Sequence, residues 1–418
     1  MISLRKLYRN FLHFDMNSDQ CKYLAKLHKL VGCNLTSPLA IRIWRVSFVL
    51  SICHALCFCY RLYMVIEKDF GFPYIVCAFN VIGGYVSGAV RMSGFINSYN
   101  DFRKFRQFMV NSSIFQRDSC EAQRIRRENY QNNQKFSVFM FIAGFSAIFI
   151  WNMTDYRATD QYRIPFELAY LDPPVKATVE TVFGLYLLQL AAYFWIPFIT
   201  TRVTMRILQA ELMVVNMAYE GLFYNAMKSS KFFSTLIATS STSNLKHTEK
   251  QLFWVFLERE LRTIVAHHKE LLINVYRIRK LASWSFLAEV FASVLIASIG
   301  VFMFMLVREE SLVLVGISCL VMLESYYNSS LVEDLEDTHL ATKEALYQLE
   351  WPSLLQYDRM YVREYKYVRR TILIVMMRSQ HRLNFHCGGL FEMSMQTFSA
   401  TVKTCYTILT FLMRVQGF

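Results

Sequence analysis

The feature that most constrains this chain is a series of apolar blocks, each long enough to cross a lipid bilayer. A helix needs roughly 20 mostly apolar residues to cross the hydrocarbon core. Only 18% of the 418 residues are charged, against about 25% in a typical soluble domain. The sequence therefore predicts an all-α membrane protein with seven transmembrane helices. The predicted spans are 43–66, 73–96, 136–154, 179–201, 284–307, 312–328 and 393–415.

The basic residues fix the orientation of these spans. Of the 45 Lys and Arg residues, 35 lie in segments on the side of the N terminus and five on the other side. Positively charged loops normally stay in the cytosol. We therefore expect a cytosolic N terminus and, after an odd number of spans, an extracellular C terminus. The same distribution accounts for the net charge of +13 without a nucleic-acid partner, which would require one exposed basic face.

The segments on the cytosolic side are long and have a helical pattern. Residues 245–280 mix apolar and charged positions and contain no Pro or Gly, so we expect them to extend a membrane helix inward and to pack on their neighbours. We divide the chain into a cytosolic N-terminal segment (1–42), six spans (43–328), a cytosolic helical anchor (329–392) and the final helix (393–418).

No motif for an enzyme, cofactor or metal site is present in the sequence. His267 and His268 are adjacent, so on a helix they point about 100° apart and make a poor metal pair; a packing role is expected for them.

None of the ten cysteines falls in an extracellular segment, and we expect no structural disulfide. Asn152 lies close to the membrane, and we do not expect it to be glycosylated. The proline-containing loop between the third and fourth spans is interpreted as a lid or vestibule wall, with a plain connector as the alternative.

Two features allow a ligand and a water-lined path. Aromatic residues reach 16% of the chain. Interfacial belts and helix packing explain most of them, but a cavity lined by aromatics and glycines also suits a small volatile apolar ligand. Periodicity alone does not separate these readings. The last span is the most polar, rich in Thr with Lys403 and Arg414, and polar groups at membrane depth tend to face other helices or water.

The carboxy-terminal fifth of the chain contains a series of motifs in a characteristic order and spacing. They are Ala345-Leu346-Tyr347, Trp351, Arg370 to Gln380, Gly388-Gly389, Phe391, Met393-Ser394, Thr397-Phe398 and Lys403-Thr404-Cys405-Tyr406. In this order and spacing the chain resembles the insect odorant receptors. Val265–Leu272 and the loop that contains Pro165 and Pro173 are weaker matches to the same family.

This resemblance implies an odorant-gated, non-selective cation channel, with subunits held together by their cytosolic helices around a pore lined by the last helix. It implies a ligand-specific (tuning) subunit that assembles with an odorant co-receptor, as a tetramer, in the plasma membrane of an olfactory neuron dendrite. The partners would be a volatile odorant, the co-receptor and membrane lipid. The alternatives are a gustatory-receptor-type channel and a G-protein-coupled or transport protein.

By resemblance, the odorant pocket lies in the outer half of the bundle, among the second, third, fourth and sixth spans. Trp151 is the strongest single candidate, because one indole buries a large apolar area; the alternative role for Trp151 is an anchor at the membrane interface. The candidate pocket residues are Phe79, Gly83, Ala147, Ile148, Trp151, Phe183, Tyr186, Ile317 and Leu320. The candidate pore residues are Thr404, Ile408, Phe411, Arg414 and Val415, with the gate assigned to Phe411 and Val415.

Overall fold

A computed structural model of the chain describes residues 13–14, 19–68, 71–112, 115–153, 164, 172–238, 245–306 and 312–417. These residues are almost entirely helical, as predicted. The elements are α2 (Lys22–Leu30), α3 (Pro38–Glu67), α4 (Phe72–Asn97), α5 (Tyr99–Ser112), α6 (Cys120–Met153), α7 (Pro173–Leu185), α8 (Leu187–Glu220), α9 (Leu222–Ala238), α10 (Leu245–Leu306), α11 (Leu312–Gln348), α12 (Trp351–Leu354), η3 (Arg359–Tyr361), α13 (Val362–Arg378), β1 (His386–Cys387), β2 (Phe391–Glu392) and α14 (Met395–Val415).

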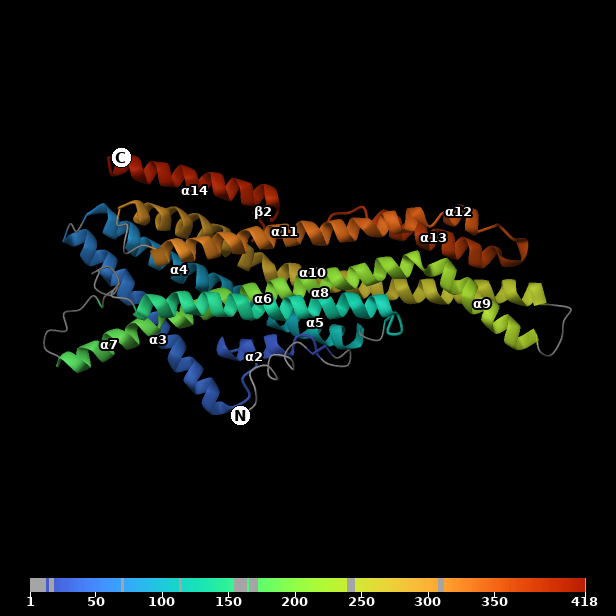
Figure 1. The fold of residues 1–418 in the computed structure, drawn as a ribbon, viewed down its shortest axis with the longest axis horizontal. Helices are drawn as coiled ribbons and strands as arrows, with labels where there is room; N and C mark the ends of the chain where they lie inside the picture. The colour runs from blue at the N-terminus through green and yellow to red at the C-terminus, as the bar shows by residue number, and fades with distance from the viewer. Residues whose placement is uncertain are drawn as a thin grey trace.

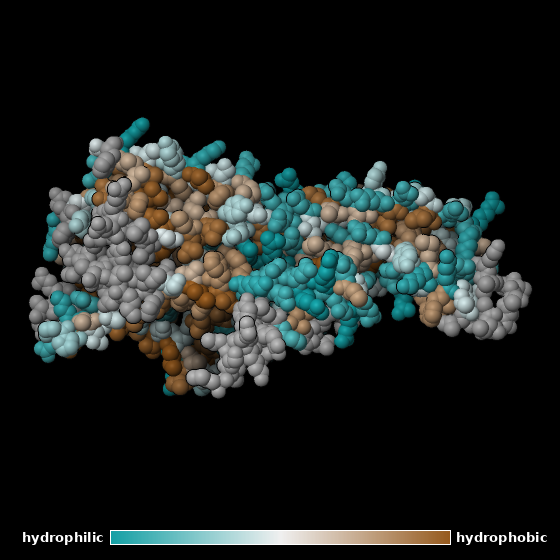
Figure 2. All heavy atoms as spheres, viewed as in Figure 1, coloured by the Kyte–Doolittle hydropathy of each residue, from teal (hydrophilic) through white to brown (hydrophobic). Residues whose placement is uncertain are grey.

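The helices lie along one long axis and form two parts (Figure 1). The membrane half holds α3, α4, α7, α14 and the adjoining lengths of α6, α8, α10 and α11. The cytosolic extension holds α9, α12, α13 and the opposite ends of the long helices. With 62 residues, α10 is roughly 93 Å long, about three times the thickness of the hydrocarbon core, so it must continue outside the bilayer. Apolar atoms dominate the visible face of the membrane half, and polar atoms cover much of the rest (Figure 2).

The seven predicted spans correspond to α3, α4, α6, the α7–α8 pair, the end of α10, the start of α11, and α14. Within the described residues, four helical stretches are long and apolar enough to cross a membrane by composition alone: Pro38–Glu67, Phe72–Asn97, Pro173–Glu220 and His247–Leu306. The other three spans do not pass this test on composition. The fourth span is interrupted at Tyr186, which separates α7 from α8.

Helix starts follow local sequence signals. Proline occupies the first turn of α3, α4 and α7, where its missing N–H has no helical partner to lose. Ser394 caps α14, because its hydroxyl accepts a hydrogen bond from the N–H of Thr397 at 3.2 Å, as expected of a serine at this position.

A short hairpin sets the start of α14. Strands β1 and β2 pair antiparallel, and the turn between them begins with Gly388 and Gly389, both with positive φ. Gly388 donates its N–H to the carbonyl of Ser283 on α10 at 2.9 Å. A Cβ at this position would lie 2.5 Å from Leu287 Cδ2, so glycine permits the close approach of the hairpin to α10.

Helix α8 forms the centre of the molecule. Nearly every residue from Ala191 to Tyr219 is buried, and the helix packs against α4, α6, α10 and α11. A helix that is apolar on all sides is stable only when it is surrounded by other elements. The core therefore runs without interruption from the membrane half into the cytosolic extension.

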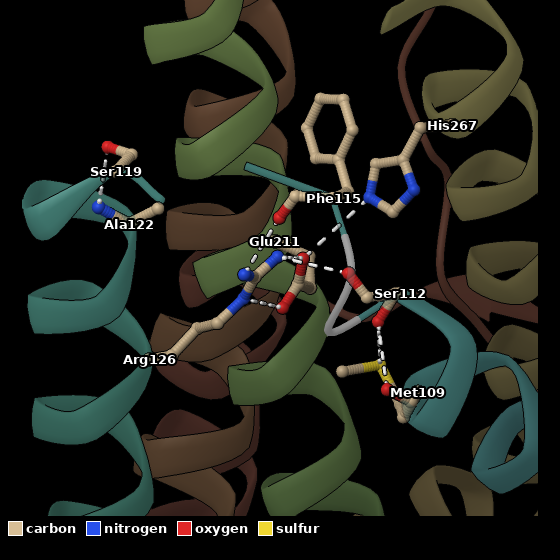
Figure 3. Close-up of polar contacts among 8 residues, drawn as sticks. All are labelled: Met109, Ser112, Phe115, Ser119, Ala122, Arg126, Glu211 and His267. Carbon is tan, nitrogen blue, oxygen red and sulfur yellow. Dashed lines mark hydrogen bonds and ion pairs between the residues drawn. The ribbon is translucent and has the colours of Figure 1, made fainter. Parts of the chain in front are cut away.

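A buried ion pair fastens four elements in the cytosolic extension (Figure 3). Arg126 on α6 donates from Nε and Nη2 to the two carboxylate oxygens of Glu211 on α8, each at 2.7 Å, and both side chains are 1% exposed. Arg126 also donates to the carbonyl oxygens of Ser112 and Phe115, and the Phe115 ring stacks on His267 of α10 with centroids 4.1 Å apart. Burial acts to raise the pKa of Glu211, but the hydrogen bonds from Arg126 and the imidazole of His267, whose Nε2 lies 3.7 Å from Glu211 Oε2, outweigh it and hold that pKa below its usual value.

Candidate ligand cavity and pore helix

A cavity of about 120 Å³, open on one side, lies in the membrane half between α4, α6, α8, α10 and α11. Its wall is formed mainly by one face of α8 and one face of α11. The lining residues are Asn80, Val81, Gly84, Gly144, Leu187, Leu190, Ala191, Phe194, Trp195, Ile296, Leu314, Ile317, Leu320 and Val321.

The cavity wall is apolar except at Asn80. This side chain is buried, and its Oδ1 has no hydrogen-bond partner. A buried amide oxygen without a partner is costly, so a bound molecule that donates a hydrogen bond would gain from contact with it. A cavity of about 150 Å³ lined by Leu, Ile and Phe is known to hold benzene. The volume here suits a molecule of similar size.

Two glycines leave the space for the largest wall residues. A Cβ at Gly144 of α6 would lie 2.6 Å from Trp195 Cδ1, so the indole lies directly on the backbone of α6. A Cβ at Gly88 of α4 would lie 3.0 Å from Leu190 Cδ1. The small residues of α4 and α6 thus admit the large side chains of α8, as small residues do at close helix contacts in membranes.

Two of the candidate pocket residues line this cavity, and others lie elsewhere. Ile317 and Leu320 on α11 are both in its wall. Phe79 is 54% exposed, and Gly83 faces Leu295 of α10, where a Cβ would meet Leu295 Cδ1 at 3.1 Å.

Phe183 and Tyr186 belong to a separate aromatic cluster around His54 of α3. Their ring centroids lie 4.1 and 5.7 Å from that of His54. The cluster joins α3 to the α7–α8 junction, away from the cavity wall.

The third-span candidates fall outside the part of the chain whose side chains the structure describes. The backbone of Ala147, Ile148 and Trp151 continues α6, one to two turns beyond Gly144. The side chain of Asn152 and most of the proposed lid loop, 154–171, also lie outside the described residues.

The residues that sequence reasoning missed come mostly from α8 and α4. Phe194, Trp195 and Leu190 lie one to three turns beyond Phe183 and Tyr186, because the helix break at Tyr186 assigns those two to the α3 cluster. The one signal for Asn80 was an amide within an otherwise apolar stretch, and such intramembrane polar residues often mark a site.

A second, larger cavity of about 310 Å³ lies between α2, α6 and α8 at the cytosolic border of the membrane half. Its wall includes Lys26, Gln20, Asn133 and Gln134 beside apolar residues. With these polar side chains in its wall, this cavity fits an apolar ligand less well than the cavity beside Asn80 does.

Helix α14 packs on α10 and α11 through one face. Thr401 and Leu412 are its buried residues, and the Cys405 thiol donates to the carbonyl of Ser293 on α10 at 3.7 Å. Its opposite face has no neighbour in the described chain, and α14 lies at the rim of the molecule (Figure 1).

The candidate pore residues fall mainly on this open face. Thr404, Phe411, Arg414 and Val415 are exposed, whereas Ile408 is partly buried against the cluster of Val76, Cys77, Ile299, Phe302, Met303 and Leu412. At 100° per residue, the middle of the open face carries Lys403, Thr407 and Arg414, with Phe411 and Val415 along one edge.

The fold is similar to that of solved insect receptors. The structure of the insect olfactory receptor OR5 from Machilis hrabei has a TM-score of 0.68 and 12% identity to this chain, and covers 94% of this chain and 97% of its own. The same receptor in complex with eugenol has a TM-score of 0.66 and 13% identity over the same shares. At this identity the likeness shows the fold alone, which includes the predicted seven membrane helices.

The family is established by comparison of the amino-acid sequence with known families. No curated protein matches this chain. The 7tm Odorant receptor family, in contrast, matches over residues 75–406, a range that contains the cavity wall, the cytosolic extension and most of α14. These receptors are not enzymes. The chain is a multi-pass membrane protein that belongs to the odorant receptor family.

Proposed function

We propose that this chain is the odorant-binding subunit of a heteromeric, odorant-gated, non-selective cation channel. The observation that carries the proposal is the apolar cavity between the membrane helices, with Asn80 in its wall. An apolar cavity with one well-placed polar group is typical of a small-molecule site.

The ligand that fits is a volatile molecule of about one ring, with one hydrogen-bond donor for Asn80. Burial of its apolar surface supplies most of the affinity, and the donor sets its orientation. A related receptor is described in complex with eugenol, which supports a small odorant as the ligand class here.

The pore in this proposal is formed where the open faces of α14 from four subunits meet. Thr404, Phe411 and Val415 form its wall, with Ile408 at the border to the packed face, and Phe411 and Val415, one turn apart, form the gate. A ring of apolar side chains closes a pore by excluding water. Arg414 lies at the outer mouth, where water screens its charge.

The effect of odorant binding is transmitted to the gate by α10 and α11. Ile296 of α10 and Leu320 of α11 line the cavity, and the same two helices pack against α14. A ligand that binds more tightly to the open arrangement of these helices shifts the population toward it. The partner is the odorant co-receptor, in the plasma membrane of an olfactory neuron dendrite.

The test is current recording with an odour panel on cells that express the chain with and without the co-receptor. With the co-receptor we expect odorant-evoked, non-selective cation current, and without it little current. Ile317→Trp fills the cavity and should abolish the response to every odorant on the panel. Val86→Trp is the matched control, because Val86 is an exposed residue of α4. This variant should respond normally to the odorants. An Ile317→Trp protein with normal surface expression and normal odorant sensitivity would remove this cavity from the proposal.

A further inference from the structure

Three charged side chains are fully buried inside the membrane half. Arg91 on α4, Glu289 on α10 and Glu324 on α11 each have 0% exposure. Arg91 Nη1 forms an ion pair with Glu324 Oε1. On the other side, Asn328 Nδ2 of α11 donates to Glu289 Oε2 at 2.6 Å. Charged residues at membrane depth are costly and usually functional.

The charges in this cluster do not balance. The stretches that surround it are 72–97 of α4, 187–201 of α8, 281–306 of α10 and 312–332 of α11. In these stretches the charged residues are Arg91, Glu289 and Glu324 alone. With both carboxylates ionised the cluster has a net charge of −1. One uncompensated buried carboxylate is costly, so a positive charge is expected to accompany it.

The cluster also contains buried oxygen atoms that accept no hydrogen bond, beside Arg91 Nε and Nη2, which likewise have no partner in the described chain. Each of these oxygens is on α10 or α11. They are Glu289 Oε1, Glu324 Oε2, Asn328 Oδ1 and Ser293 Oγ. Glu324 and Asn328 are four residues apart, as are Glu289 and Ser293, so each pair shares one face of its helix.

We propose that Glu289, Glu324 and Asn328, with the hydroxyl of Ser293, form a binding site for a monovalent metal cation such as sodium. Carboxylate, amide and hydroxyl oxygens are the ligands of hard cations. A single positive charge makes the cluster neutral, whereas a divalent ion would leave a net charge of +1 in the membrane. A proton on Glu289 would also neutralise the cluster, but it would use only one or two of the four oxygens.

The site lies between the ligand cavity and the start of α14. The Arg91 guanidinium stacks on the ring of Phe194, 4.0 Å from its centroid, and Phe194 lines the cavity. On the other side, Ser329, the residue after Asn328 on α11, donates its hydroxyl to Met393 Sδ at 3.9 Å. Cys387 belongs to the hairpin that leads into α14, and its thiol contacts Met393 Sδ at 3.7 Å. A bound cation would thus stabilise the packing of α4, α10 and α11 beneath the cavity.

The test measures the thermal unfolding midpoint of the purified full-length protein in detergent. It compares sodium chloride with N-methyl-D-glucamine chloride at equal ionic strength and pH 7.5. A ligand that binds only the folded state raises its stability, and we expect sodium to raise the midpoint by about 2–4 °C with saturation. The readout requires no channel activity, so its failure is separate from a failure of the proposed function.

Substitutions at the proposed cation site test whether it causes the sodium-dependent rise of the thermal midpoint. Glu289→Gln keeps the shape and removes the charge, and its midpoint should be the same in both salts. Ser293→Ala removes one ligand and should raise the half-saturating sodium concentration about tenfold, which supplies a test if Glu289→Gln does not fold. Glu344→Gln, an exposed carboxylate of the same α11, should respond to sodium as the wild type does. Equal wild-type midpoints in both salts, or a sodium response that survives in Glu289→Gln, would overturn the proposal.

Discussion

Asn80 is the residue on which odorant selectivity should depend. Its amide oxygen is the unpartnered polar atom in the described wall of the cavity. We predict that Asn80→Leu raises the half-activating concentration at least tenfold for odorants with a hydroxyl group, because one hydrogen bond of about 1.4 kcal/mol is lost. Apolar odorants of the same size should keep their potency or gain. Dose–response curves for matched pairs of odorants measure this.

The control for Asn80 is its neighbour Phe79, which is exposed on the other side of α4. Phe79→Leu should leave both curves unchanged. An equal loss of sensitivity to both odorant classes in Asn80→Leu would mean that the amide supports the fold of α4 and does not contact the ligand.

Single residues of the site could be predicted only in part. Ile317 and Leu320 share a face of α11 that points inward, and both line the cavity. Phe183 and Tyr186 do not, because α7 ends at Leu185 and both rings pack on His54. In a helix that is apolar on all sides, periodicity does not mark the face that meets a cavity, so the contributions of α8 were not predictable.

The charged cluster was also not predictable as a unit. Arg91 was visible within a span, but its partners Glu289 and Glu324 come from helices some 200 residues later.

At the scale of elements, the Arg126–Glu211 pair joins α6 and α8. We predict that Glu211→Gln lowers stability by about 3–5 kcal/mol, because it leaves the buried Arg126 without a counter-charge. The measurement is the thermal midpoint and the amount of folded protein in detergent. Glu258→Gln is the control, since Glu258 pairs with Arg262 on the surface of α10, and such pairs contribute about 0–1 kcal/mol.

A double variant separates charge from packing at this pair. Arg126→Met with Glu211→Leu removes both charges and keeps most of the volume, so it should recover most of the lost stability. If it were as unstable as Glu211→Gln, the hydrogen bonds from Arg126 to Ser112 and Phe115 would be the dominant contribution.

The contact between α10 and α11 in the cytosolic extension should weaken in acid. Burial, and then the charges of His339 and His267, lower the pKa of His268 to about 4, and burial lowers the pKa of His339. The unfolded pKa of histidine is about 6.5. Below that pH the unfolded chain binds protons that the folded chain excludes, so stability is complete above pH 6.5 and is lost as the pH falls toward 4.

His268→Asn tests this pH dependence. The thermal midpoint of the wild type should fall between pH 6.5 and 5, and the midpoint of the variant should fall less steeply. His247→Asn, at an exposed histidine of the same helix, should follow the wild type. Parallel slopes for all three proteins would show that other groups cause the acid sensitivity.

Helix α14 carries the prediction about the gate. Phe411 and Val415 are exposed side chains one turn apart on its open face. If they close the pore, Phe411→Ala or Val415→Ala should raise the current without odorant, because a smaller ring admits water. Arg414→Gln should increase inward cation conductance and leave odorant sensitivity unchanged. Wild-type basal current and ion selectivity in all three variants would place the pore lining on another face.

At the scale of the whole molecule, much of the architecture follows from the sequence. Seven apolar blocks and the uneven distribution of Lys and Arg predict the spans and the long helices of the extension, because both signals sum over many residues. The break at Tyr186 and the hairpin at Gly388 depend on single contacts, so a windowed pattern misses them. Three spans, α6, α11 and α14, contain more polar residues than the other four. Two of them belong to the proposed sites: α14 has the open face, and α11 contains Glu324.

The exposed apolar surfaces of the molecule predict that the chain depends on a partner protein. Apolar side chains are exposed along α13 and its surroundings, with Tyr347, Met360 and Met377 each at least 66% exposed, and the face of α14 opposite α10 has no neighbour in the described chain. Exposed apolar surface of this kind marks a protein interface. We predict that Met377→Asp, co-expressed with the co-receptor, loses surface protein and odorant-evoked current together, because a buried carboxylate would oppose assembly.

The matched control is Tyr224→Asp on α9, an equally exposed apolar residue at the far end of the cytosolic extension. Substituting an exposed residue costs the fold of a single chain little, so both variants should have wild-type thermal midpoints when purified alone. Surface biotinylation and co-purification with the co-receptor then distinguish assembly from folding. Met377→Asp should reduce co-purification at least tenfold, while Tyr224→Asp should retain it. Normal co-purification of Met377→Asp would mean that α13 faces water in the assembled channel and that α14 and its neighbours hold the subunits together.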